Sequence, residues 1–98
     1  MEQPPPRTPP QPPPQIDYEH RLAPHRQIAA WVQERIVSGD ISPGTRIPSE
    51  KDLVGMFGVA RTTARRAVAW LREQEMVETE PGRGTYVLQP PGEPPGGS

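Results

Sequence analysis

Apolar side chains recur every three to four residues in three stretches of the middle of the chain, which is the spacing of amphipathic helices. The first stretch carries them at Ile28, Val32 and Ile36, with Trp31 beside them. Pro24 suits the first turn of a helix, because an amide hydrogen has no helical partner there. Gly39 suits the end of a helix, since glycine adopts the left-handed conformation that closes it. The pattern predicts a helix over residues 24–38.

The second stretch follows a turn at Pro43 and Gly44 and two residues, 46–47, that suit extended backbone. Ser49 and Asp52 have the spacing of a capping box, and the proline before them disfavours helix. A helix is therefore expected to begin at the serine and to end at the next Phe-Gly pair. Its apolar side is expected at Leu53, Met56 and Phe57.

The third stretch, residues 61–74, separates small apolar positions from basic ones. Placed at about 100° per residue, one face carries Ala64, Ala67, Val68 and Leu71. The other side carries Arg61, Thr62, Arg65, Arg66 and Ala69. The two alanines allow another helix to approach closely, so this helix and the preceding one suit a tight helix–turn–helix.

The last patterned segment predicts a hairpin. Val77 and Thr79 alternate with two glutamates, residues 85–88 are good strand formers, and the turn 81–84 lies between them. The expected fold class is mainly α with a small β-hairpin, a winged helix–turn–helix of three helices plus a two-stranded wing.

Composition changes the picture at the two ends of this 98-residue chain. Eight of the sixteen prolines lie in residues 1–15, and four more lie in residues 90–98. Such segments bury too little apolar surface to order, so we expect a disordered proline-rich arm and a disordered tail. We expect one domain, residues 16–89, between them, and we expect no small-molecule effector domain in this chain.

The distribution of charge favours DNA as a partner, and the residue types present argue against a catalytic or metal site. The net charge is −1, yet residues 21–89 hold ten Lys/Arg against eight Asp/Glu, and four of the ten fall within 61–72. A local basic face of this kind is compatible with DNA binding. His20 and His25 are five apart, cysteine is absent, and no catalytic motif occurs, so we expect no catalytic residue, metal site or cofactor. No apolar run reaches the length of a membrane span.

Three sequence blocks stand in order along the chain: RIPSEKDL (46–53), FGVARTTARRAV (57–68) and PGRGTYV (81–87). Together they resemble the DNA-binding domain of the GntR family of bacterial regulators, over about residues 21–88. The resemblance implies that the third helix enters the major groove of DNA and that the wing reaches the adjacent minor groove.

The site residues follow from that resemblance. Arg61 and Arg65, four apart on one helix face, would contact DNA by forking onto guanine or phosphate, with Arg65 or Arg61 as the main base reader. Thr62 would reach a phosphate or a thymine methyl. Lys51, where the family usually has arginine, would contact phosphate or a base. The expected wing contacts are Gly82 and Arg83.

Other positions modify this picture. Ala60 replaces the Ser or Thr that usually caps the third helix, and Ala64 replaces a more usual valine. Glu50 is expected to be structural, pairing with an arginine of the third helix. For Trp70 two interpretations stay open, a cover for the core and a dimer contact, and we expect Trp31 or Trp70 to be the exposed apolar anchor of a dimer.

These observations predict a sequence-specific DNA-binding transcription regulator, a repressor, that acts as a homodimer on an operator of two similar half-sites. Its expected location is the cytoplasm, on the nucleoid when bound. The alternative is a winged-helix protein-interaction module that does not read DNA. The low net charge, Ala60 and the wing glutamates favour the alternative, whereas Arg61, Arg65 and Arg83 oppose it.

Overall fold

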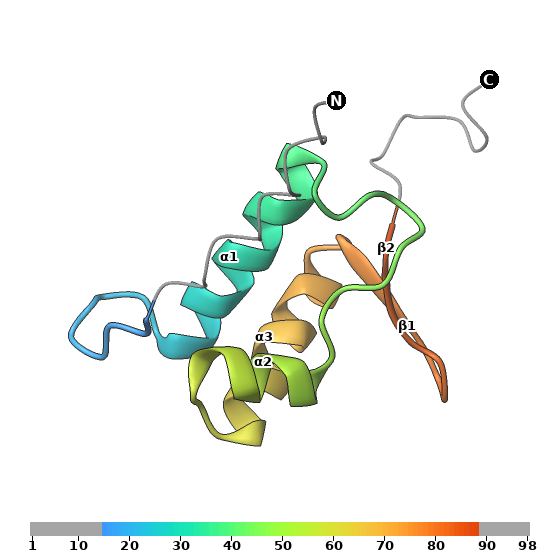
Figure 1. Cartoon of the computed structure of the whole chain (residues 1–98). Coiled ribbons are helices and arrows are strands. Elements are labelled where there is room, and N and C mark those ends of the chain that lie inside the picture. Colours follow the sequence, from blue (N-terminus) through green and yellow to red (C-terminus); the bar gives the residue numbers. More distant parts are fainter. Residues whose placement is uncertain (1–14, 89–98) are drawn as a thin grey trace, which may run out of the picture.

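A computed structural model describes residues 15–88, and its elements follow the predicted order. Helix α1 spans Pro24–Ser38, α2 spans Glu50–Phe57 and α3 spans Arg61–Glu73. Strands β1 (Val77–Glu80) and β2 (Gly84–Val87) form one antiparallel hairpin (Figure 1). The winged helix–turn–helix layout is confirmed, with α3 ending one residue earlier than expected.

The expectations for the two ends of the chain lie almost wholly outside the described residues. Only Gln15 belongs to both the predicted arm 1–15 and the described part, and the tail 90–98 lies outside it. The domain boundaries 16–89 therefore stay a prediction.

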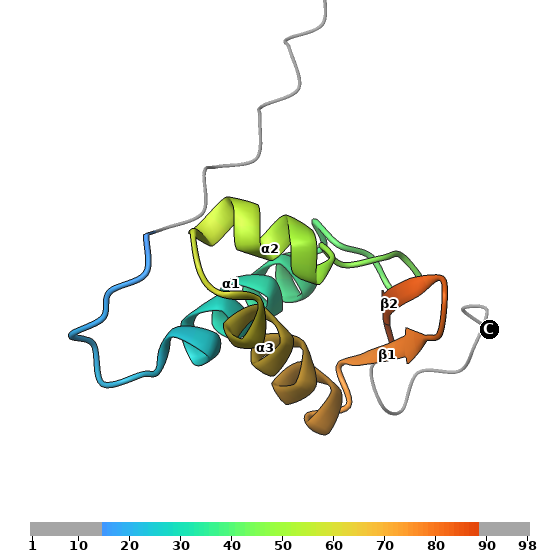
Figure 2. The ribbon, with the colours of Figure 1, turned by 90° about the horizontal axis from the view of Figure 1, so that it is seen from below.

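The hairpin and the segment before α1 lie on opposite sides of the helices (Figures 1 and 2). Helix α3 contacts α1, α2 and β1, and it is the element that joins the others. The hairpin is the wing of the fold, and it stands beside α3 without covering the arginine-bearing side of that helix, whose side chains stay exposed.

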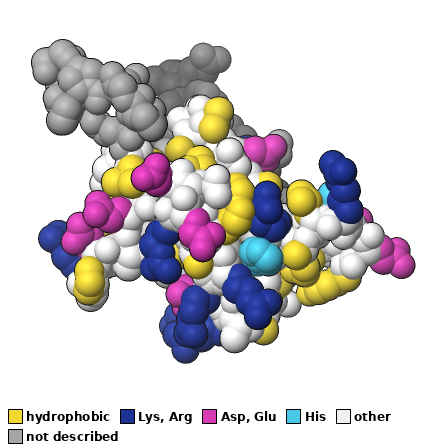
Figure 3. Space-filling view, turned by 180° about the vertical axis from the view of Figure 1, so that it is seen from behind, with side chains coloured by type: hydrophobic (Ala, Val, Ile, Leu, Met, Phe, Trp, Pro, Cys, Tyr) yellow, Lys and Arg dark blue, Asp and Glu magenta, His cyan; other side chains and the backbone are white. Residues whose placement is uncertain are grey.

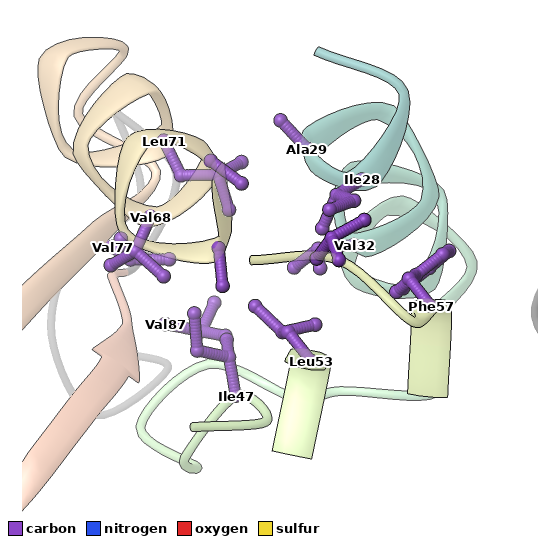
Figure 4. Close-up of a cluster of buried hydrophobic side chains, with 13 residues drawn as sticks. Ile28, Ala29, Val32, Ile47, Leu53, Phe57, Val68, Leu71, Val77 and Val87 are labelled. Carbon is purple, nitrogen blue, oxygen red and sulfur yellow. The ribbon is translucent and has the colours of Figure 1, made fainter. Parts of the chain in front are cut away.

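The core is formed by one face of each helix and by the base of the wing (Figure 4). Its buried side chains are Ile28, Ala29, Val32, Ile47, Leu53, Phe57, Val59, Ala64, Ala67, Val68, Leu71, Val77 and Val87. All four residues expected on the inward face of α3 are among them. The two alanines are fully buried, which confirms the close approach that small side chains permit.

One core prediction for α2 was wrong. Leu53 and Phe57 are buried, but Met56 is 37% exposed. Because α2 is only eight residues long, its inward face is centred on Leu53 and Phe57, with Val54 packed at the edge of the core. Met56 lies on the other side of that centre and faces solvent.

The predicted capping box at the start of α2 is confirmed. The Asp52 amide donates to Ser49 Oγ at 3.0 Å, and the Ser49 amide donates to Asp52 Oδ2 at 3.1 Å. The backbone bond from Ser49, followed by its side chain, lowers the pKa of Asp52 below its usual value. This cap orients the helix that carries Glu50 and Lys51.

The wing is fixed at its base by the segment before α2. Ile47 donates its amide to Thr85 at 2.9 Å, Val87 donates to Thr45 at 2.9 Å, and Gly44 donates to Val87 at 2.8 Å. The two predicted extended residues, 46–47, therefore pair with β2. None of the helices within residues 15–88 is long and apolar enough to cross a bilayer.

Helix α3 ends in a left-handed residue that the sequence analysis missed. Glu75 has a φ of 59°, while the Met76 amide donates to Leu71 and the Glu75 amide donates to Arg72. This is a Schellman ending, and it places glutamate where glycine is preferred.

Glu75→Gly is therefore expected to raise the free energy of unfolding by about 1 kcal/mol, because a side chain in the left-handed region costs about 1–2 kcal/mol. The midpoint of urea denaturation measures the change. Gln74→Gly is the matched control, since Gln74 has a φ of −83° and should lose stability. Equal shifts for both variants would contradict the strain at Glu75.

Candidate nucleic-acid interface

The first half of α3 presents polar and basic side chains to solvent. Arg61, Thr62, Arg65 and Arg66 are all exposed, whereas the opposite face of the helix is buried. Lys and Arg side chains gather in the lower half of the face seen in Figure 3, with a few Asp and Glu side chains among them. The structure therefore leaves this part of α3 free to contact a flat or grooved partner.

The start of α3 lacks a side-chain cap. Ala60 occupies the N-cap position with extended backbone, and no side chain accepts a hydrogen bond there. The expectation of a lost cap at Ala60 is confirmed. The first backbone amides of α3 therefore have no side-chain acceptor at this helix end.

Glu50 brings the two principal arginines together. Its Oε1 lies 3.6 Å from Arg65 Nε and 4.0 Å from Arg61 Nε. The expected pairing with one arginine of the third helix is thus confirmed and extends to two. Arg61 and Arg65 keep 72% and 62% of their side-chain surface exposed, so each pair is weak and solvent-screened. The carboxylate orients both guanidinium groups without removing them from solvent.

Lys51 is exposed in the first turn of α2 and lines an open shallow hollow of this helix. The other residues around the hollow are Pro48, Asp52, Gly55 and Met56. No ion pair within residues 15–88 involves Lys51, so its ammonium group remains available. Lys51 directly follows Glu50 in α2, and Glu50 pairs with Arg61 and Arg65 of α3. Lys51 and these arginines therefore come from the two helices of the helix–turn–helix.

The tip of the wing is built by two glycines around Arg83. Gly82 and Gly84 have φ values of 77° and 136°, and the Arg83 amide donates to the Glu80 carbonyl at 2.9 Å. Arg83 is exposed and lines a shallow hollow of the hairpin together with Glu78, Glu80 and Tyr86. The glutamates therefore share a hollow with Arg83 and form no ion pair with it among the described residues.

Two arginines hold the wing and were given no role by the sequence. A Cβ built on Gly84 would lie 3.1 Å from both Cδ and Nε of Arg46, so the Arg46 side chain crosses the wing at this glycine. Arg72 Nη1 donates to Thr79 Oγ1 at 3.2 Å. The signal for Arg46 was its place directly before the predicted extended residue Ile47; the signal for Arg72 was its position on the basic side of α3.

Both tryptophans are partly buried and pack against the core, which supports the interpretation of Trp70 as a cover for the core, while the dimer contact stays a prediction. Trp31 contacts Phe57 edge to face at 5.6 Å between ring centres. The Arg26 guanidinium lies 4.3 Å above the Trp70 ring. The large apolar side chains exposed within residues 15–88 are instead Tyr18, Val37 and Met56.

His20 lies in the turn before α1. His20 Nδ1 accepts a hydrogen bond from the Leu22 amide at 2.9 Å, a local turn contact. In the described part of the chain, no group of three His, Asp or Glu side chains is arranged to hold a metal ion. His20 thus has a local structural role.

Comparison with known sequences places residues 24–87 in the profile of the bacterial regulatory proteins of the gntR family. The mannosyl-D-glycerate transport/metabolism system repressor MngR of Escherichia coli is 44% identical over 65 residues, which are 66% of this chain and 27% of that protein. The histidine utilization repressor of Klebsiella aerogenes is 36% identical over 69 residues, covering 70% of this chain and 29% of the repressor. The chain thus spans about a quarter of the length of these curated relatives.

Solved structures agree with the sequence relatives. The AraR DNA-binding domain in complex with its operator ORR3 has a TM-score of 0.68 at 33% identity and covers 74% of this chain and 88% of that chain. YtrA from Sulfolobus acidocaldarius, a GntR-family transcription factor, has a TM-score of 0.70 at 29% identity, covering 76% and 79%. The matched part is the three-helix domain with its wing.

Proposed function

The chain belongs to the GntR family of bacterial regulatory proteins, and we propose that it is a transcription regulator that binds operator DNA sequence-specifically. The observation that carries the proposal is the exposed arginine side of α3, where Glu50 orients Arg61 and Arg65 together. The operator complexes of the related AraR domain support it. The family consists of regulatory proteins, and the proposal includes no catalytic step.

In this proposal α3 enters the major groove, whose width admits one α-helix. Arg61 and Arg65 each carry a planar fork of N–H donors that matches guanine O6 and N7 or a phosphate. Thr62, in the same first turn, reaches a phosphate or a thymine methyl. Lys51 at the start of α2 contacts the phosphate backbone as a point charge.

Glu50 contributes by restricting the Arg61 and Arg65 side chains in part before DNA arrives. Long side chains lose rotamer freedom on binding, at about 0.5–1.5 kcal/mol each. A shared carboxylate that already restricts Arg61 and Arg65 reduces that cost. Because the pairs are solvent-exposed, phosphate or a base edge replaces or supplements the carboxylate with little penalty.

We further propose that the protein is a repressor and that it binds two half-sites as a homodimer. Its proposed location is the cytoplasm, on the nucleoid when it is bound to DNA. Repressor relatives such as MngR and the histidine utilization repressor support the sign of regulation. A two-fold operator matches a two-fold protein dimer, because each domain then reads one half-site. Sedimentation of the chain with and without operator DNA tests the dimer.

The proposed wing contact gives the first functional prediction. The minor groove presents a degenerate pattern of donors and acceptors, so Arg83 would respond to groove width and charge. Arg83→Ala is expected to weaken binding to all duplexes by similar factors and to make the slope of log K against log[salt] shallower by about one unit. The measurement is titration at several salt concentrations of two duplexes. One is enriched by the wild-type chain from a random-sequence library, here named the selected duplex, and the other is its scrambled counterpart.

A loss restricted to the selected duplex would contradict this role for Arg83. Glu34→Ala is a control for titration itself, since Glu34 is exposed on α1 and belongs to no proposed contact. Its slope should equal that of the wild-type chain.

The second candidate function is a protein-interaction module with the same fold. The net charge of −1 and the engagement of both arginines by Glu50 favour it. Affinity of the wild-type chain for a random duplex distinguishes the two. Several phosphate contacts predict a steep negative slope of log K against log[salt], whereas absence of salt-dependent binding would favour the interaction module.

A further inference from the structure

We propose that Arg72 is a positioning residue that holds the wing in a fixed orientation relative to the recognition helix α3. The inference rests on the proposed function, because its consequence is for the minor-groove contact of Arg83. It concerns a residue that touches no DNA in this scheme and acts through Thr79.

The outer half of the wing has little core burial to hold it. Val77 and Val87, paired across the hairpin, are buried, but residues 78–83 are all exposed. A two-stranded hairpin is marginally stable by itself in water. The position of Arg83 must therefore depend on contacts that reach the wing beyond its buried base.

Arg72 makes such a contact with β1, and Thr79 links that contact to β2. Its Nη1 donates to Thr79 Oγ1 at 3.2 Å, and Thr79 Oγ1 lies 3.0 Å from Thr85 Oγ1. Thr79 and Thr85 are direct partners in the hairpin register, two pairs outward from the buried valines and on the same face of the hairpin. Side chains alternate between the two faces of a strand, so Glu78 and Tyr86 lie on the opposite face. The threonine pair thus lies on the face of the wing that is turned toward Arg72 of α3.

The other end of this connection is the helix that carries the proposed base readers. Arg72 follows Arg61 by eleven residues, about three helical turns, and lies about 20° from it around the helix axis. Arg61, Arg65 and Arg72 therefore form one row along a single side of α3. Because a helix is stiff over this length, a bond from Arg72 to the wing fixes the wing against the same body that places Arg61 and Arg65.

The charge of Arg72 is not used elsewhere in the described structure. The ion pairs found within residues 15–88 involve Arg35, Arg61 and Arg65 and leave Arg72 out. A basic residue in the last turn also interacts favourably with the helix dipole. That interaction would affect stability alone, whereas a positioning role makes DNA affinity depend on the acceptor Thr79 as well.

The test is a double-mutant cycle on the full chain with the selected duplex. Arg72→Ala and Thr79→Val should each weaken binding about threefold to tenfold, and together no more than either does alone. In an Arg83→Ala background, Arg72→Ala and Thr79→Val should lose most of their effect on affinity. The reason is that the wing then lacks the arginine whose position they are proposed to disturb. Thr79→Ser, which keeps the hydroxyl, should bind like the wild-type chain.

Arg66→Ala is the matched control, since Arg66 is an exposed arginine of the same helix outside this row. Its effect should be additive with Arg83→Ala. If Arg72→Ala is equally additive and Thr79→Val binds like the wild-type chain, Arg72 contacts DNA directly or acts on stability alone, and the inference is overturned.

A measurement on the free chain separates this inference from the proposed function. Backbone order parameters of residues 82–84 should fall in Arg72→Ala and in Thr79→Val and stay unchanged in Arg66→Ala. Unchanged values in all three variants would overturn the positioning role even if DNA binding is normal. Lowered values in a chain that binds no DNA would support the positioning role and defeat the proposed function.

Discussion

Arg65→Ala is expected to weaken binding to the selected duplex by about 1–3 kcal/mol, which corresponds to roughly a fivefold to hundredfold loss of affinity or more. The reason is the fork of N–H donors that Arg65 can direct at a guanine edge from the exposed side of α3. Glu50 already orients this guanidinium, at 3.6 Å from its Nε. Much of the loss should be absent on the scrambled duplex, where no matching base edge is presented.

Arg65→Lys is the matched control for charge. It keeps one positive charge but loses the planar fork, so affinity for the scrambled duplex should be retained while preference for the selected duplex falls. Titrations of wild type and both variants on the two duplexes measure the difference. Equal losses on both duplexes in Arg65→Ala would show that Arg65 contacts phosphate and does not read a base.

Leu71→Ala is expected to lower the free energy of unfolding by about 2–5 kcal/mol, because truncating a buried leucine removes apolar contacts and leaves a cavity. Leu71 is fully buried, on the face of α3 that meets the rest of the core (Figure 4). A domain of this size has only about 0.05–0.15 kcal/mol of stability per residue. The substitution should therefore remove a large part of the free energy of unfolding of the domain. Urea denaturation followed by circular dichroism measures this loss.

Val37→Ala serves as the apolar control, since Val37 is 76% exposed on α1. Surface changes of this kind stay within about 0.5 kcal/mol. Similar losses for Val37→Ala and Leu71→Ala would contradict the packing of α3 described above. Folded Leu71→Ala at low temperature should still bind DNA, since the Leu71 side chain is buried in the core and belongs to no proposed DNA contact.

The elements were predictable because their signals are local. Pro24, Gly39 and the Ser49–Asp52 capping box mark helix ends by backbone chemistry within a few residues. The inward face of α3, with its small side chains, was likewise predictable, because it follows from the periodicity of apolar residues within that one helix. Met56 was misassigned because the centre of the buried face of α2 depends on how that short helix packs, which is a tertiary property.

Other features depend on contacts between distant segments. The Gln27 side chain donates through Nε2 to the carbonyls of Asp17 and Leu22, and its Oε1 accepts from the Asp17 backbone amide. It therefore ties the segment before α1 to that helix. The left-handed conformation of Glu75 follows from the junction of α3 with β1, since glutamate has no local preference for it. Neither feature has a pattern that sequence periodicity reveals.

The candidate site divides in the same way. The shared face of Arg61 and Arg65 follows from their spacing of four. The motif led us to expect that Glu50 pairs with one arginine of the third helix, and the structure shows that it pairs with both. The roles of Arg46 and Arg72 could not be read, because long side chains reach partners on other elements whose position only the fold determines. Both contact the wing, whose outer half is exposed.

The central claim is sequence-specific DNA binding, and the most direct measurement is the ratio of dissociation constants for the selected and scrambled duplexes at one near-physiological salt concentration. We expect the wild-type chain to bind the selected duplex at least about tenfold more tightly, a difference of about 1.4 kcal/mol. Equal dissociation constants for the two duplexes, or no enrichment of any sequence from the random library, would contradict it.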